Sequence, residues 1–235
     1  MFRFLWLRRF INKYIRTRPG LFIAIMSKRS KFKNIIVNKD TEIVIEGYPR
    51  SANTFAVAAF NYSQNRKVVI GRHTHAPAQI MSAVAAGLPV ILLIRKPMDA
   101  IISLAIRDET ISLKNALKTY IWYHQSILPI IDGCVIADFN QVTNDFSSFI
   151  NEVNIKYKTE YSLFDHNKES EKNIFKLVED MEIEDSGGGL RESHVARPSD
   201  SRKNIKQEFK QQLELPENTH LLMECSRLYE RITTS

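Results

Sequence analysis

The sequence lacks the features of several large protein classes. Its 235 residues include only two cysteines, Cys134 and Cys225, which form no metal-binding or disulfide pattern. No repeat, low-complexity tract or linker divides the chain, so one globular domain is expected at 44% hydrophobic and 25% charged residues. Cys134 lies in an apolar run and is expected to be a buried free thiol, which fits a reducing, cytoplasmic compartment.

Acidic side chains are absent from residues 1–38, which contain ten lysines and arginines. The whole chain has a formal net charge of +7, so subtracting those ten charges leaves −3 for residues 39–235. The basicity therefore belongs to an N-terminal arm, residues 1–38, and the domain expected over residues 39–235 is mildly acidic. This distribution argues against nucleic acid as a partner, and no nucleic-acid-binding module is visible.

Long apolar runs are missing from the start of the arm. In residues 1–20 the longest run has four residues, whereas a membrane-spanning helix needs about 20 and a signal peptide also needs a longer apolar core. Four apolar residues repeat at helical spacing: Phe4, Leu7, Ile11 and Tyr14. The basic residues lie largely on the other side. Such a helix either lies on an anionic membrane surface or packs on the domain with its basic side in water.

Four short apolar runs predict buried β-strands, at residues 42–47, 67–71, 89–94 and 134–139. They are continuous rather than alternating, as expected of strands that are covered on both faces. Segments with helical spacing separate them, at residues 54–64, 77–86 and 98–130. This β-α-β order predicts an α/β fold: a parallel β-sheet flanked by helices, in a three-layer sandwich like that of P-loop NTPases.

The segment "IEGYPRSANTF" lacks the lysine of a Walker phosphate-binding loop, G-x-x-x-x-G-K-[ST]. Gly47 and Thr54 occupy the outer positions of that pattern, but Ala52 replaces the second glycine and Asn53 replaces the lysine. The cation of the loop is Arg50, three residues earlier. A strand followed by a helix N-terminus still predicts an anion site. An ATP-dependent kinase, however, would lose its main contact to the γ-phosphate.

Two further polar groups follow the ends of predicted strands, where ligands of parallel sheets bind. His75 follows the second strand and is a candidate general base, although His73 could serve the same role. The two histidines have a metal-ligand spacing, but no third ligand is near them in the sequence. Arg95 follows the third strand, and Ser103 lies eight residues later on a helix. We expect Arg95 and Ser103 to converge on one phosphate.

Three segments at these strand ends resemble the PAPS-dependent sulfotransferases, where PAPS is 3′-phosphoadenylyl sulfate. "YPRSANTF" is similar to the family's 5′-phosphosulfate loop, Y-P-K-S-G-T-T-W, and "THAP" to its T-H-L-P segment, which carries the base. "RKPMDAIIS" resembles its 3′-phosphate segment, R-N-P-K-D-x-x-x-S, with the same spacing from Arg to Ser. More weakly, "RKNIKQEF" resembles the R-K-G…G-D-W-K-N-x-F loop. The likeness spans roughly residues 42–210.

The resemblance implies an enzyme that moves a sulfuryl group from PAPS to a hydroxyl or amine by in-line displacement. PAP (adenosine 3′,5′-bisphosphate) would be the product, and no metal would be needed. His75 would be the base, with Arg50 and Ser103 as further catalytic residues. The implied cofactor-binding residues are Pro49, Arg50, Ser51, Ala52, Asn53, Thr54, Phe55, Arg95, Ser103, Arg197, Arg202 and Lys203.

The sequence departs from the family pattern at several of these positions. Arg50 replaces lysine, Ala52 and Asn53 replace Gly-Thr, and Phe55 replaces the tryptophan of an adenine-stacking wall. The C-terminal segment lacks the G-D-W core, which leaves open whether Arg197, Arg202 or Lys203 contacts the 3′-phosphate.

Two other functions remain open from the sequence: a P-loop kinase of small molecules, and a non-catalytic protein that binds anions or membranes through its basic arm. Acceptor specificity is expected to reside in loops, at residues 107–120 and 160–200. A carbohydrate, lipid head group, phenol or peptide acceptor all fit, and the arm favours a glycan or lipid-linked acceptor with peripheral membrane contact.

Overall fold

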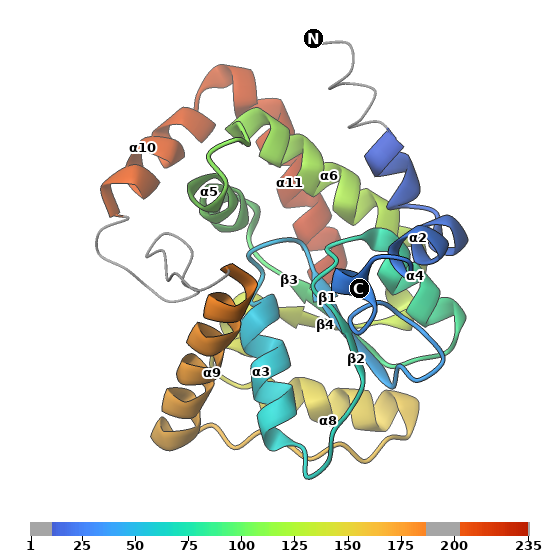
Figure 1. The fold of residues 1–235 in the computed structure, drawn as a ribbon. Helices are drawn as coiled ribbons and strands as arrows, with labels where there is room; N and C mark the ends of the chain where they lie inside the picture. Colours follow the sequence, from blue (N-terminus) through green and yellow to red (C-terminus); the bar gives the residue numbers. More distant parts are fainter. Residues whose placement is uncertain (1–10, 187–202, 235) are drawn as a thin grey trace.

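The computed structural model describes residues 11–186 and 203–234, and it is built on a parallel four-stranded sheet (Figure 1). The strands are β1 (Ile43–Gly47), β2 (Ile70–Arg72), β3 (Val90–Ile94) and β4 (Val135–Asp138), in the order β2-β1-β3-β4. All three pairings are parallel, which confirms the α/β fold expected from the sequence. The second strand has only three residues and starts three residues later than expected.

Helices cover both faces of the sheet, as Figure 1 shows. One face carries α3 (Asn53–Ser63), α8 (Phe146–Tyr157) and α9 (Lys168–Ser186). The other face carries α4 (Pro77–Ala85), α5 (Pro97–Arg107), α6 (Leu113–Ile127) and α11 (Pro216–Thr233). Further helices are α2 (Pro19–Met26), α7 (Phe139–Val142), α10 (Lys203–Leu213) and the 3₁₀ segments η1 (Ser30–Phe32) and η2 (Leu128–Gly133), and residues 11–15 are also helical. Both apolar layers are buried, as the continuous strand pattern predicts.

The stretch at 98–130 is not one helix. It is divided into α5, a turn and α6, with η2 at its end. The turn forms because Asp108 Oδ1 accepts the backbone N–H of Thr110 at 3.0 Å, and Ser112 then caps α6 by accepting the N–H of Asn115 at 3.3 Å. Most of the acceptor loop expected at residues 107–120 is therefore the first half of α6.

The described part of the N-terminal arm packs on the domain, but not with the expected face. Ile11 and Tyr14 are about half exposed, whereas Ile15 and Phe22 pack with the start of α4. Arg16 belongs to the basic side, which was expected to face a membrane surface or water. It contacts the domain instead, because its guanidinium satisfies backbone carbonyls there. Among the described residues, no helix is both long and apolar enough to cross a membrane. Membrane contact through the arm stays a prediction.

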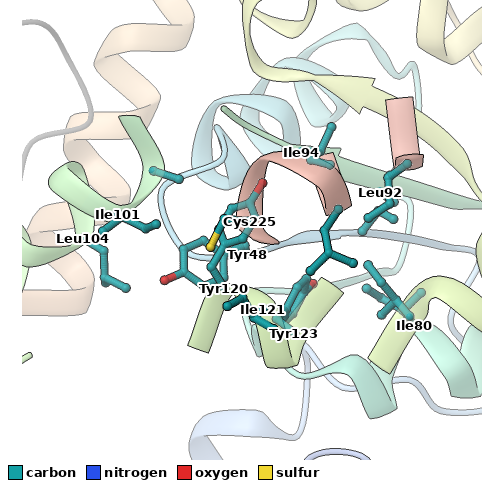
Figure 2. Packing of buried hydrophobic residues seen from close by; sticks show 14 of the residues in the cluster. Tyr48, Ile80, Leu92, Ile94, Ile101, Leu104, Tyr120, Ile121, Tyr123 and Cys225 are labelled. Carbon is teal, nitrogen blue, oxygen red and sulfur yellow. The ribbon is translucent and has the colours of Figure 1, made fainter. Parts of the chain in front are cut away.

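The core between the sheet and α6 is rich in aromatic rings. Tyr48, Tyr120 and Tyr123 pack edge to face, with ring centroids 5.0 and 5.9 Å from that of Tyr48, and Cys225 of α11 lies beside them (Figure 2). Cys134, expected as a buried free thiol, is buried and unpaired with another cysteine. His124 is fully buried in the same layer, and its Nδ1 donates to the carbonyl of Tyr120 at 2.9 Å. Burial lowers the pKa of His124 to about 4.

This histidine should make the fold sensitive to acid. A folded-state pKa of about 4 lies below the ordinary value of 6.5, so neutral His124 contributes stability above pH 6.5 that is lost as pH falls toward 4. The free energy of unfolding should fall by about 3 kcal/mol across this window. Urea unfolding at pH 7, 5 and 4 measures the loss. The His124→Phe variant should be less stable than the original protein at pH 7, but its free energy of unfolding should depend less on pH. An unchanged pH dependence in that variant would contradict the assignment of the acid sensitivity to His124.

Candidate functional site

The predicted site residues gather where the sheet changes the direction of its connections. The chain leaves β1 for α3 on one face and leaves the neighbouring β3 for α5 on the other face. The two connections therefore diverge and leave a crevice at the carboxyl ends of the strands, which is the usual ligand position in such sheets. The loop after β1, residues 48–52, starts at this edge from the strand that lies between β2 and β3.

The loop after β1 has an unusual backbone. Arg50 and Ala52 have positive φ angles of 72° and 67°, although neither is glycine. Ala52 therefore occupies the second-glycine position of the Walker pattern with the backbone conformation that favours glycine there. Within the described part of the chain, the N–H groups of Ala52, Asn53 and Thr54 donate to no protein acceptor. These N–H groups begin α3, so they form an anion-binding helix N-terminus.

Glycine at position 52 should relieve this strain. Alanine in the left-handed conformation destabilises the fold by about 1–2 kcal/mol. Glycine removes this strain but lowers stability by about 0.4–1 kcal/mol, because it increases the conformational entropy of the unfolded chain. Ala52→Gly should therefore stabilise the fold by roughly 0.5–1 kcal/mol, measured as a higher denaturant midpoint. Gly87→Ala is the matched control, since Gly87 has φ +68° and open space around it. It should destabilise by a similar amount, and a stabilising effect there would refute the argument.

Glycine is required at position 47 for a different reason than at position 52, namely the close packing of two strands. A Cβ atom at this position would lie 2.3 Å from the carbonyl oxygen of Leu93 on β3. The first glycine of the Walker-like pattern therefore follows from the close approach of β1 to β3.

Arg50, Arg95 and Ser103 lie in direct contact. Arg50 Nε donates to Ser103 Oγ at 3.0 Å, and Arg95 Nη1 donates to the backbone carbonyl of Arg50 at 2.9 Å. The structure thus brings together the cations after β1 and β3 and the serine on α5. The side chain bonded to Ser103 is that of Arg50, and the convergence of Arg95 and Ser103 on one phosphate stays a prediction.

Arg95 is held from several sides. Its guanidinium lies over the ring of Phe139, 3.9 Å from the centroid, and its carbonyl accepts the hydroxyl of Tyr120 at 2.9 Å. Arg95 Nε is buried without a hydrogen-bond partner among the described residues. Burial lowers the pKa of Arg95, and the charges of Asp99 and Asp138 oppose that shift. Sequence reasoning missed Phe139, although it directly follows the fourth strand, where ligand-facing residues are expected.

His75 lies in the same crevice with one nitrogen committed to the protein. Its Nδ1 is 2.9 Å from the carbonyl oxygen of Gly47 and 3.3 Å from Glu46 Oε1. Because a carbonyl oxygen only accepts, Nδ1 must carry the proton, and Nε2 is then the lone-pair nitrogen of neutral His75. The side chain is 28% exposed and lines the neighbouring cleft.

Glu46 is a fully buried carboxylate behind His75. It also accepts the backbone N–H and the hydroxyl of Thr74, at 2.8 and 2.9 Å. Burial alone would raise the pKa of Glu46, but the hydrogen bond and charge of His75, the charge of His73 and the Thr74 N–H outweigh it and lower that pKa. An ionised carboxylate therefore orients the imidazole. Sequence reasoning missed Glu46, although a single acid inside an apolar strand was the available signal.

His73 points elsewhere. Its Nδ1 lies 2.9 Å from Arg72 Nη1, and its ring centroid is 6.2 Å from that of His75. Both histidines have positive φ angles, 54° and 50°, so this short segment is strained like the loop after β1. Only His75 of the pair lines the neighbouring cleft.

The arm supplies Arg16 to this site, although the sequence predicted its basic side to face either an anionic membrane or water. Arg16 Nη2 donates to the carbonyls of Thr74, at 3.1 Å, and of His75. The carbonyl of Arg16 accepts the N–H of Ala78 at 2.9 Å. Residues 11–18 therefore brace the strained segment that carries His75. Burial lowers the pKa of Arg16, and the charges of Tyr123 and Glu46 oppose that shift.

A cleft of about 590 Å³ opens beside His75. It is lined by Arg16, Tyr48, Pro49, His75, Leu104, Arg107, Asp108, Ile111, Thr119, Trp122 and Tyr123. It connects the imidazole with α5, α6 and the N-terminal arm, and its volume suits a small organic molecule.

The other predicted residues have mixed positions. Ser51 Oγ is buried without a partner among the described residues, and Asn53 Nδ2 donates to the carbonyl of Tyr48 at 3.0 Å. Phe55 is buried beside Phe175 and His166, with ring centroids at 6.2 and 6.4 Å. Lys203 begins a helix, α10, where a loop was expected. Arg197 and Arg202 lie outside the described residues.

No protein-family model and no curated protein matches this chain. Among solved structures, a mouse sulfotransferase in complex with PAP is similar to it, with 10% sequence identity and a TM-score of 0.46. The alignment covers 88% of this chain and 91% of that one. The function must therefore be argued from the side chains of this protein.

Proposed function

We propose that the protein transfers a sulfuryl group from PAPS to an acceptor hydroxyl or amine. One observation carries the proposal: the tips of three adjacent strands are joined by direct contacts. His75 contacts Gly47 at the end of β1, and Arg95 after β3 contacts Arg50 in the loop after β1. A base and two guanidinium groups beside a helix N-terminus support the proposal of a site for a doubly phosphorylated nucleotide.

The residues present fit the phosphates of such a nucleotide. Buried Ser51 Oγ and Arg95 Nε have no partner among the described residues, and buried donors in proteins are almost always satisfied. Anionic oxygens would satisfy both donors, together with the N–H groups that begin α3. No lysine is needed at position 53 for this, since a sulfuryl group carries less charge than a transferred phosphoryl group.

His75 would act as the general base through Nε2. Glu46 and the carbonyl of Gly47 hold Nδ1–H and would stabilise the imidazolium once it forms. The acceptor O–H would give its proton to Nε2 while its oxygen bonds to sulfur. The bond from sulfur to the bridging oxygen would break and release PAP. Arg50, Thr54 and the loop amides would stabilise the charge that develops on the leaving phosphate.

Arg95 and Ser103 would hold the 3′-phosphate. They are joined through Arg50, so the groups that bind the two phosphates support each other. The ring of Phe139 lies against the guanidinium of Arg95, and the hydroxyl of Tyr120 donates to its backbone carbonyl. A side chain supported in this way loses little freedom on binding.

Calorimetry with PAP and with ATP–Mg²⁺ tests the proposal against a kinase, and labelled PAPS then tests transfer. We expect PAP to bind at least tenfold more tightly than ATP–Mg²⁺, and the label to appear on an acceptor. Metal-dependent ATP binding without PAP binding would overturn the proposal in favour of a kinase. Binding of neither nucleotide would favour a non-catalytic protein.

A further inference from the structure

We infer that residues 11–33 of the N-terminal arm form a docking surface for an anionic lipid bilayer. The surface, called the arm surface below, consists of exposed apolar and basic side chains: Ile11, Tyr14, Arg18, Leu21, Lys28, Arg29, Lys31 and Lys33. The arm would lie among the lipid head groups without crossing the membrane. This inference goes beyond the proposed function, and its test requires no sulfuryl transfer.

The arm packs on the domain through one side. Ile15 and Phe22 share a small apolar cluster with Ala76 and Ala78, at the start of α4. Figure 1 shows α2 beside α4 at the edge of the molecule, and these two helices are in contact. The side of the arm that faces away from this cluster is therefore the side exposed to solvent.

Three large apolar side chains of the arm lie on this exposed side. Ile11, Tyr14 and Leu21 are 47, 50 and 43% exposed. Ile11 and Tyr14 are three residues apart in a helical segment, so they share one face of it. An amphipathic helix normally buries its apolar residues against the core. An uncovered apolar stripe beside cations therefore indicates an interaction site.

Five exposed cations accompany these apolar side chains: Arg18, Lys28, Arg29, Lys31 and Lys33. Within the part of the chain that the structure describes, none of the five forms an ion pair. The sequence contains no acid before Asp40, which directly follows another cation, Lys39. The helix under α2 is α4, whose sequence PAQIMSAVA has no charged residue. The positive charge of the arm surface is therefore not neutralised by the layer beneath it, and it complements an anionic bilayer.

A lipid bilayer matches both the charge and the apolar side chains of the arm surface. The guanidinium of Arg18 lies over the ring of Tyr14, 5.1 Å from its centroid. Tyrosine and arginine are both suited to the head-group level, because each has an apolar body and a polar end. The phosphate backbone of a nucleic acid would pair with the lysines but would leave Ile11 and Leu21 in water. The exposed apolar residues thus favour lipid over nucleic acid.

Flotation of the full-length protein with two kinds of vesicle tests the inference. One kind is phosphatidylcholine alone, and the other contains about one-third phosphatidylserine. We expect the anionic vesicles to bind the protein about tenfold more tightly or better. Each lysine near such a surface contributes about fivefold in affinity, so removing three should weaken binding roughly 100-fold. The variant for this combines Lys28→Gln, Lys31→Gln and Lys33→Gln.

The matched control removes three exposed lysines of α9 and so changes the net charge equally: Lys168→Gln, Lys172→Gln and Lys176→Gln. Because charges far from the lipid contact are screened by salt, this control should lose no more than about threefold in affinity. The apolar residues are tested separately. Leu21→Ser should weaken binding about three- to tenfold, whereas serine at another exposed leucine, Leu163, should leave it unchanged.

Equal binding to the two kinds of vesicle, or binding to neither, would overturn the inference. Equal losses in the two triple-lysine variants would overturn it as well, since general charge attraction would then explain the binding. A DNA duplex is the competing ligand. If the duplex binds more tightly than the anionic vesicles, and Leu21→Ser leaves vesicle binding unchanged, the arm surface is a site for nucleic acid and not for lipid.

Discussion

Replacing His75 with alanine is expected to lower turnover of PAPS by about 10²- to 10⁴-fold, while the affinity for PAP stays within about twofold. The reason is geometric: His75 Nδ1 is held by Gly47 and Glu46, so Nε2 is the nitrogen that can take the proton of the acceptor. None of the proposed contacts to the phosphates uses this ring. Single-turnover rates with labelled PAPS and calorimetry with PAP measure the two effects separately.

His73→Ala is the matched control for this experiment. It removes a neighbouring imidazole that is turned toward Arg72, so its turnover should remain within about tenfold of the original value. Full activity of His75→Ala, or a larger loss in His73→Ala, would reject His75 as the base.

Replacing Arg95 with alanine should remove recognition of the 3′-phosphate. A hydrogen bond to a charged group contributes about 1.5–3 kcal/mol, so the affinity for PAP should fall by roughly 10- to 150-fold. The affinity for adenosine 5′-phosphate, which lacks the 3′-phosphate, should fall much less. The ratio of the two dissociation constants is the quantity to measure, because it cancels general damage to the fold.

Ser103→Ala should reduce the affinity for PAP less than Arg95→Ala does. Its hydroxyl is a neutral group bonded to Arg50, so a loss of about 1 kcal/mol, or about fivefold in PAP affinity, is expected. Equal losses for PAP and adenosine 5′-phosphate in Arg95→Ala would mean that Arg95 only supports the loop after β1, through the carbonyl of Arg50.

The sequence predicted the sheet well because continuous apolar runs leave few alternatives. Strands that are buried on both faces must be covered by the helices between them, which makes the sheet parallel and puts every strand end at one edge. That order places Arg95 and the loop of Arg50 at the same edge, where the structure shows them in contact. Ala52 was recognised only as a replacement for the second glycine of the Walker pattern, and its positive φ is a finding of the structure.

Contacts between distant segments could not be predicted in the same way. Arg16 looked like a solvent-facing residue because helical periodicity assigns faces but not partners, and its partners are backbone carbonyls 58 and 59 residues away. Glu46 shares a strand with apolar residues, and its role depends on a histidine 29 positions later. The contact of Phe139 with Arg95 could not be predicted either, because it depends on the pairing of β3 with β4.

The positions at which helices begin and end could not be predicted from the periodic pattern of apolar residues either. The turn at residues 108–112 interrupts a stretch with helical spacing, and side-chain caps from Asp108 and Ser112 decide its position. The same limit applies to α10, where a loop was expected from the resemblance and a helix begins at Lys203.

The most direct measurement is a crystal structure of the full chain with PAP bound. The 5′-phosphate should contact the N–H groups of Ala52, Asn53 and Thr54, and the 3′-phosphate should lie within hydrogen-bond distance of Arg95 and Ser103. His75 Nε2 should face the 5′-phosphate from the side of the cleft. A structure in which PAP binds away from these strand ends would contradict a single nucleotide site at the tips of β1, β2 and β3.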